Sequence, residues 1–168
     1  ADMARLNIAQ IIGARGVEEF SAEKHDQAIA SFTKASEINP HSRDYMFNLA
    51  QSYYAKSSKI EERFTALVAE REALTKAKKT PEAKAKADEA AKVGAELVPL
   101  LDQIVKISEK TLQVDPASES LYHLIARSYK VTGDVASDPA QQASWRNKAL
   151  EVLTKKDAMP VDVTEISI

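Results

Sequence analysis

Three histidines are the side chains of this chain best suited to metal binding or proton transfer, and they lie far apart at His25, His41 and His123. Protein metal sites usually draw two or more ligands from a short, regular spacing of histidines, cysteines or carboxylates. None of these histidines has a second histidine or an acidic cluster at such a spacing, and the chain has no cysteine. The sequence therefore predicts no metal site.

One serine and several carboxylates are of the types needed for covalent or acid–base catalysis. Ser31 and Lys34 match Ser-x-x-Lys, but they lie within a predicted helix, and the further motifs of an acylating enzyme are missing. Catalytic carboxylate pairs need burial to separate their pKa values. The adjacent carboxylates stand among lysines on predicted helices and are Glu18-Glu19, Glu61-Glu62 and Asp88-Glu89. We expect all of these side chains on solvated helix surfaces, and we predict no enzyme activity and no cofactor.

Five lysines with a single carboxylate between them could contact phosphate groups. They are Lys76, Lys78, Lys79, Lys84 and Lys86, and the carboxylate is Glu82. Nucleic-acid sites usually combine such charges with arginine or aromatic side chains, which this stretch lacks. We therefore do not expect nucleic acid as the partner, and we interpret the lysines as solubilising a projecting segment.

The composition of the 168 residues sets the fold class. Only four glycines occur, aromatic residues make up 6%, and the formal net charge is −2. This composition favours an all-α protein without a global field that would recruit nucleic acid or an anionic membrane. No run of about 18 apolar residues is present, so no membrane span is expected. The absence of cysteine leaves the compartment open.

Apolar periodicity and proline positions predict the helices. Two short helices are predicted at about 3–20 and from about 24–26 to 38. The second of them ends at Asn39-Pro40. Two long helices follow, joined at Thr80-Pro81 and ending at Asp115-Pro116, with Thr80 as the expected N-cap of the second. The next helix is expected to end in a turn at 132–134. Asp138-Pro139 is then expected to begin the last helix.

The two long helices carry residues, mostly apolar or small, in alternating steps of three and four, which is heptad spacing. These positions are Ile60, Phe64, Leu67, Arg71, Leu74, Ala83, Ala87, Ala90, Gly94, Leu97, Leu101 and Ile104. We therefore predict an antiparallel coiled-coil arm with a thinly packed, mobile tip. Pro99, which removes a backbone hydrogen bond, is expected to kink the helix where the arm ends.

Small and aromatic residues recur in the order known from one repeat family. Gly16, Ala28, Phe32, Ala35 and Pro40 resemble the tetratricopeptide repeat, a helix–turn–helix unit of 34 residues. Leu49, Ala50, Tyr53 and Tyr54 resemble its first helix again, as do Leu121, Leu124, Ile125 and Tyr129. The resemblance implies one domain, 1–160, with units at about 9–42, 43–118 and 119–160 and an insertion at about 57–98. Residues 161–168 are expected to begin a following, β-like segment of a longer parent protein.

The resemblance also implies a binding surface, because tetratricopeptide arrays bind protein segments on their concave face. The positions that correspond to this face are Phe47, Asn48, Gln51, Tyr54, His123, Arg127 and Lys130. The subtype that captures terminal carboxylates carries lysine, arginine and asparagine at positions occupied here by Gly13, Val17, Ser120 and Leu124. We therefore expect an interaction scaffold for a protein or peptide that does not capture a terminal carboxylate. The alternative is a structural module that forms a homo-oligomer through the arm.

Overall fold

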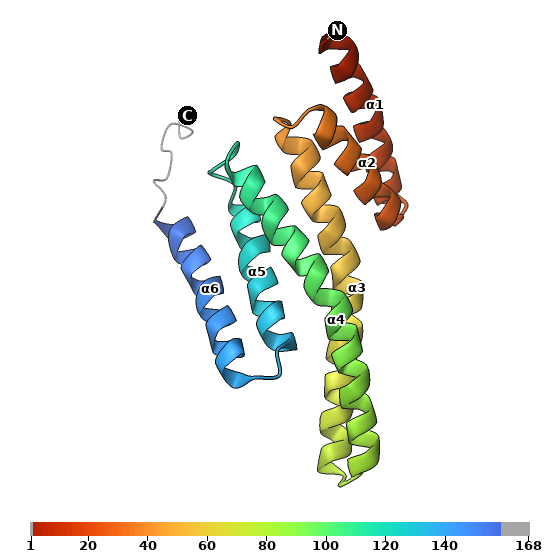
Figure 1. The fold of residues 1–168 in the computed structure, drawn as a ribbon, viewed down its shortest axis with the longest axis vertical. Helices are drawn as coiled ribbons and strands as arrows, with labels where there is room; N and C mark the ends of the chain where they lie inside the picture. The colour runs from red at the N-terminus through yellow and green to blue at the C-terminus, as the bar shows by residue number, and fades with distance from the viewer. Residues whose placement is uncertain (1, 159–168) are drawn as a thin grey trace, which may run out of the picture.

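Six α-helices make up residues 2–158, the part of the chain that the computed structural model describes. They are α1 (Asp2–Ser21), α2 (His25–Ile38), α3 (Arg43–Lys76), α4 (Thr80–Leu112), α5 (Glu119–Val135) and α6 (Pro139–Asp157). Each helix packs against the next along the chain, so the helices follow one another across the molecule in chain order (Figure 1). The predicted all-α fold is confirmed for these residues. None of the six helices is both long and apolar enough to cross a membrane.

Proline stops and one cap set the helix boundaries as the sequence predicted. Helix α2 ends at Ile38, directly before Asn39-Pro40, and α4 ends three residues before Asp115-Pro116. At the start of α6 the Asp138 carboxylate accepts hydrogen bonds from two backbone N–H groups of the first turn, both at 3.3 Å. This cap satisfies donors that the helix itself leaves without partners.

Two predicted details of the turns are wrong. The chain leaves α3 through a turn in which the Lys79 N–H donates to the Leu74 carbonyl at 2.9 Å and Lys78 has a φ of 58°. Because this turn extends to Lys79, that residue is the N-cap of α4, and Thr80 is already helical. The turn expected at 132–134 is part of α5 instead. Gly133 serves close packing there, since an added Cβ would lie 3.1 Å from the Cβ of Trp145 on α6.

The core follows the stack of helices in three clusters. The first joins α2 to α3 through Ala28, Phe32 and Leu49, and the largest joins α3, α4 and α5 around Leu97, Ile104 and Leu121. A third, smaller cluster of Leu67, Ala90 and Val93 lies between α3 and α4. Burial of these side chains, at about 25 cal/mol per Å² of apolar surface, is the main force holding the stack together.

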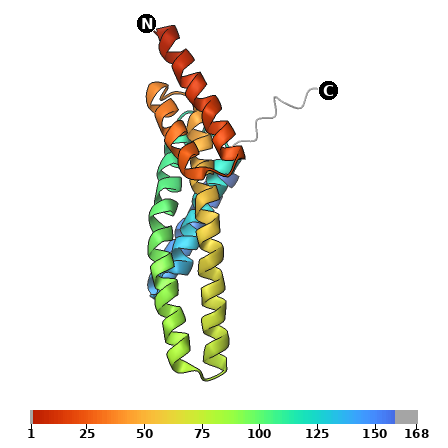
Figure 2. The same cartoon turned by 90° about the vertical axis from the view of Figure 1, so that its right-hand side faces the viewer.

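Helices α3 and α4 run antiparallel and extend beyond the other helices as a hairpin (Figure 2). None of the twelve predicted packing positions is exposed. The coiled-coil geometry and the mobility of the tip stay predictions. Helix α4 continues through the exposed Pro99 and changes direction along its length, so that its first half follows α3 and its second half packs against α5 (Figure 1). Pro160 and the β-like segment 161–168 lie outside the described residues.

Candidate interaction face

One face of α3 and one face of α5 carry the residues predicted to bind a partner. Asn48, Gln51 and Tyr54 follow each other at intervals of three residues on α3, which places them on one side of that helix. On α5 the predicted residues, His123, Arg127 and Lys130, are spaced by four and three. The three residues on α3 are half-buried, whereas His123 and Lys130 are exposed.

Three hollows lie along this face. The first, between α1, α2 and α3, has a volume of about 80 Å³ and is lined by Val17, Phe20, Phe32, Asn48 and Gln51. The second, between α3 and α5, measures about 550 Å³ and is lined by Tyr54, Ser58, Glu61, Glu62, Thr65, Ala66, Ala69 and Arg127. The third, between α5 and α6, measures about 470 Å³. We call it the α5–α6 groove, and it includes His123, Arg127 and Lys130. Six of the seven predicted residues therefore line these hollows.

The side-chain amides of Asn48 and Gln51 make no hydrogen bond to any described residue, although both side chains are half-buried. Their hollow is otherwise lined by the apolar side chains of Val17, Phe20 and Phe32. An amide offers two donors and one carbonyl acceptor, which is the set needed to pair with a peptide backbone. The first hollow can therefore accept a segment whose backbone hydrogen-bonding groups need partners.

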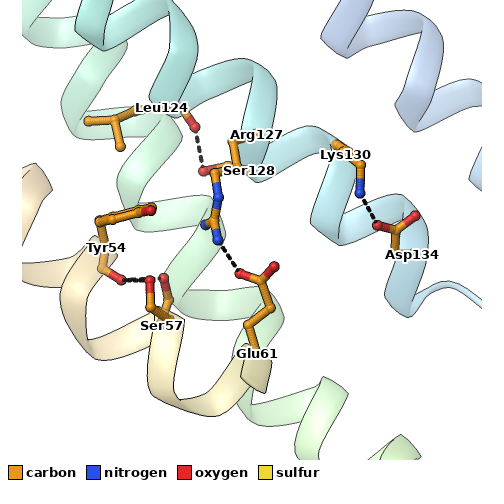
Figure 3. A network of polar contacts seen from close by, with 9 residues as sticks. Tyr54, Ser57, Glu61, Leu124, Arg127, Ser128, Lys130 and Asp134 are labelled. Carbon is orange, nitrogen blue, oxygen red and sulfur yellow. Dashed lines mark hydrogen bonds and ion pairs between the residues drawn. The ribbon is translucent and has the colours of Figure 1, made fainter. Parts of the chain in front are cut away.

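Arg127 connects the second and third hollows and joins α5 to α3. Its guanidinium donates to the Glu61 carboxylate at 2.8 Å and stacks over the Tyr54 ring, 4.7 Å from the ring centre (Figure 3). Both members of the ion pair are partly buried, so water screens it less than a fully exposed pair. The contact fixes the position of Arg127 before any partner arrives and also stabilises the packing of α5.

Phe47 is the one predicted residue that lines none of the three hollows. It packs against the central core cluster, and the Arg43 guanidinium lies 5.3 Å from its ring centre. Arg43 in turn donates to Asp115, and this hydrogen bond raises the pKa of Arg43. Phe47 is therefore part of the packing between α3 and the end of α4.

Four side chains that were predicted to be solvated are partly or fully buried, namely Ser31, Glu19, Glu61 and Glu89. Ser31 is 1% exposed and donates to the Glu19 carboxylate at 2.6 Å, whereas Lys34 is exposed as predicted. Glu19 and Glu61 are only 17% and 23% exposed at their side chains, because each bonds to a residue on another helix. The sequence shows which residues share a helix face, but it does not show which neighbouring helix covers them.

The lysines at the hairpin tip differ in their surroundings. Lys86 pairs with Glu70 across the hairpin at 2.8 Å, and this hydrogen bond raises the pKa of Lys86. Lys76, Lys78, Lys79 and Lys84 are exposed and form no ion pair with a described residue. Within the described part of the chain, no group of three histidine, cysteine, aspartate or glutamate side chains could hold a metal ion.

Sequence reasoning missed the contribution of α6 to this face. Arg146 and Leu150 line the α5–α6 groove, and Leu150 is 61% exposed. Both residues lie on the last predicted helix, four residues apart, but neither was among the residues predicted to bind a partner. An arginine four residues before a leucine on the last predicted helix was the available signal.

Comparison of the sequence with protein-family models and with curated proteins finds no match.

Proposed function

We propose that this chain is a tetratricopeptide-like scaffold that holds a protein segment along the face formed by α1, α3 and α5. The observation that carries the proposal is the pair of unpartnered amides, Asn48 and Gln51, at an apolar hollow. The adjoining hollows extend the same face to Arg127, Lys130 and His123. The proposal assigns the chain no catalytic role.

The order of the helices supports the assignment to this repeat family. Helices α1 and α2 pack as one pair and α5 and α6 as another, while the ends of α3 and α4 nearest the core occupy the middle unit. In this scheme the outer parts of α3 and α4 are the insertion at about 57–98. First helices of the units then supply most residues of the binding face, and α6, the second helix of the last unit, adds Arg146 and Leu150.

Capture of partner proteins from an extract of the source organism tests the proposal. Because the amides of Asn48 and Gln51 have no partner within the described chain, changing both to alanine should leave the fold intact. We expect the double variant to lose about tenfold or more of a captured partner, as is usual for residues central to an interface. Gln103→Ala, at an exposed glutamine on α4, is the matched control and should capture as wild type does. Equal capture by the double variant and by Gln103→Ala would exclude the first hollow as the binding site.

Self-association through the hairpin, the alternative function, has less support. The large exposed apolar side chains of the described residues are Met3, Leu6, Ile8, Ile11, Val17, Val114 and Leu150, and none lies on α3 or α4. The apolar residues of the hairpin face each other, which leaves little apolar surface for a second copy. Light scattering should therefore give the same association state for the full chain and for a variant whose hairpin is shortened by removing residues 68–92. A change from oligomer to monomer would favour the alternative.

A further inference from the structure

The α5–α6 groove combines an apolar floor with a positively charged rim. Its floor is formed by Ala126, Ala149, Leu150 and Leu153. Ala126 and Ala149 are 5% and 8% exposed, whereas Leu150 remains 61% exposed. The four charged or ionisable side chains that line it are Arg127, Lys130, His123 and Arg146, and no carboxylate is among the lining residues.

Nearby carboxylates neutralise these cations only in part. Asp134 lies 2.6 Å from the Lys130 ammonium and 3.6 Å from the Arg146 guanidinium, so one carboxylate serves two cations. Arg127 is paired with Glu61 outside the groove, and His123 has no partner among the described residues. The rim therefore keeps an excess positive charge, which attracts a partner of opposite charge.

The groove lies between two helices, which limits the form of the segment that fits. Backbone groups within α5 and α6 are bonded inside those helices, so they offer no edge to which an extended strand could add. A segment that satisfies its own backbone, an α-helix, meets this condition. The rim from His123 to Lys130 spans seven residues, or about 10 Å, which corresponds to two turns of a helix.

We propose that the α5–α6 groove binds an acidic amphipathic helix of a partner protein. Leucine-like side chains of that helix lie on Leu150 and Leu153, and its flanking carboxylates meet Arg146, Lys130 and His123. The inference rests on the proposed scaffold function and names the chemistry of the partner at one end of the same face.

Two synthetic peptides of about 14 residues test this inference by fluorescence anisotropy with the full chain. Both carry leucine at the same i, i+3, i+4 and i+7 positions; one has glutamate at the flanking positions and the other has lysine. We expect the glutamate peptide to bind about tenfold or more tightly than the lysine peptide, and to weaken as salt is raised. Equal binding of the two peptides, or no saturable binding of either, would overturn the inference.

Variants of α6 separate groove binding from general charge attraction. Leu150→Asp and Arg146→Glu should each weaken binding of the glutamate peptide about tenfold. Lys148→Glu changes the net charge as Arg146→Glu does, but Lys148 lies over the Trp145 ring at 4.0 Å and does not line the groove. It should therefore have a much smaller effect, and circular dichroism should show all three variants folded. An equal loss of peptide binding in Lys148→Glu and Arg146→Glu would contradict the inference. A dimer that Leu150→Asp dissociates would also contradict it, because the groove would then be filled by a second copy of the chain.

The outcomes for the groove and for the scaffold function are distinguishable. If partner capture depends on Asn48 and Gln51 while the glutamate peptide does not bind, only the groove inference fails. If the glutamate peptide binds in a Leu150-dependent way while partner capture is unchanged by substitution of Asn48 and Gln51, only the proposal of the wider binding face fails.

Discussion

At the scale of single residues, glycine and its neighbours decide how closely the helices approach. A Cβ added at Gly16 on α1 would lie 2.9 Å from the ring of Phe32, which is 1% exposed and held by the surrounding core. In the middle of an ordinary helix, glycine costs about 0.5–1 kcal/mol relative to alanine. At Gly16 the contact with Phe32 reverses that preference.

We therefore expect Gly16→Ala to lower the free energy of unfolding by about 1–3 kcal/mol, the usual cost of overpacking. Denaturant unfolding followed by circular dichroism measures this loss. Asn7→Ala, at an exposed position of the same helix, controls for helix propensity and should leave stability unchanged or slightly raised. In a Phe32→Leu background the same Gly16→Ala change should cost less, because the two side chains are in contact. Additive losses would show that the ring contact is not the cause.

Lys78 tests backbone strain at the hairpin tip. Its φ of 58° lies in the left-handed region, which costs a non-glycine residue about 1–2 kcal/mol. Lys78→Gly should therefore stabilise the chain by about 1 kcal/mol. The net gain is reduced because glycine has more backbone freedom in the unfolded chain. Lys78→Ala removes the same charge but keeps a Cβ, so it should not give this gain. Thermal unfolding of the wild type and both variants measures this difference. An equal rise in the unfolding temperature of both variants would attribute the gain to the loss of the lysine charge.

At the scale of the elements, ion pairs connect the outer parts of α3 and α4 beside the third core cluster. Glu89 on α4 accepts a hydrogen bond from Arg63 on α3 at 3.3 Å, and this bond, aided by Lys86, lowers the pKa of Glu89 below its ordinary value of 4.5. A carboxylate whose pKa is lowered by folding stabilises the folded state above its ordinary pKa. That contribution is lost as the pH falls through the folded-state pKa.

We therefore expect the hairpin to lose stability as the pH falls below the ordinary carboxyl pKa of 4.5, through protonation of Glu89 among other carboxylates. The measurement is the denaturant midpoint of the wild type and of Glu89→Gln at several pH values. Glu89→Gln should lower the midpoint at neutral pH and flatten its dependence on pH. Glu96→Gln, at an exposed glutamate in the middle of α4 that forms no ion pair with a described residue, should change neither. Parallel curves for wild type and Glu89→Gln would contradict this role.

The boundaries of the elements were predictable because they depend on local chemistry. Proline after Asn39 and after Asp115, and the Asp138 cap before Pro139, act on residues close in sequence, so their effect is visible without the fold. The turn expected at Gly133 was wrong because glycine there serves the approach of Trp145 from another helix. Local signals therefore identified helix ends but not the reasons for glycines inside helices.

For the residues of the candidate face, too, the sequence predicts positions on each helix but not the contacts between helices. The resemblance to the tetratricopeptide repeat predicted Asn48, Gln51 and Arg127 as face residues, and in the structure each of them lines a hollow. Pairing across helices could not be derived, because nothing local links Arg127 to Glu61, 66 residues away. For the same reason the sequence did not predict that Leu150 on α6 would adjoin the cations of α5.

At the scale of the whole molecule, six helices pack in chain order, with the amide pair at the hollow between α1, α2 and α3 and the basic, apolar groove between α5 and α6. The hairpin extends away from this stack (Figure 2). A partner that occupies the full face would contact α1, α3, α5 and α6 but not the outer side of α4. This separation of surfaces makes the proposed scaffold function directly testable.

Site-specific photocross-linking in an extract of the source organism is the most direct test of that function. A photoreactive amino acid would replace Gln51 in one variant, His123 in a second, and the exposed α4 residue Gln103 in a third. The proposed function predicts that the same partner cross-links from positions 51 and 123 and not from position 103. A partner that cross-links from position 103 and from neither of the other two would contradict it.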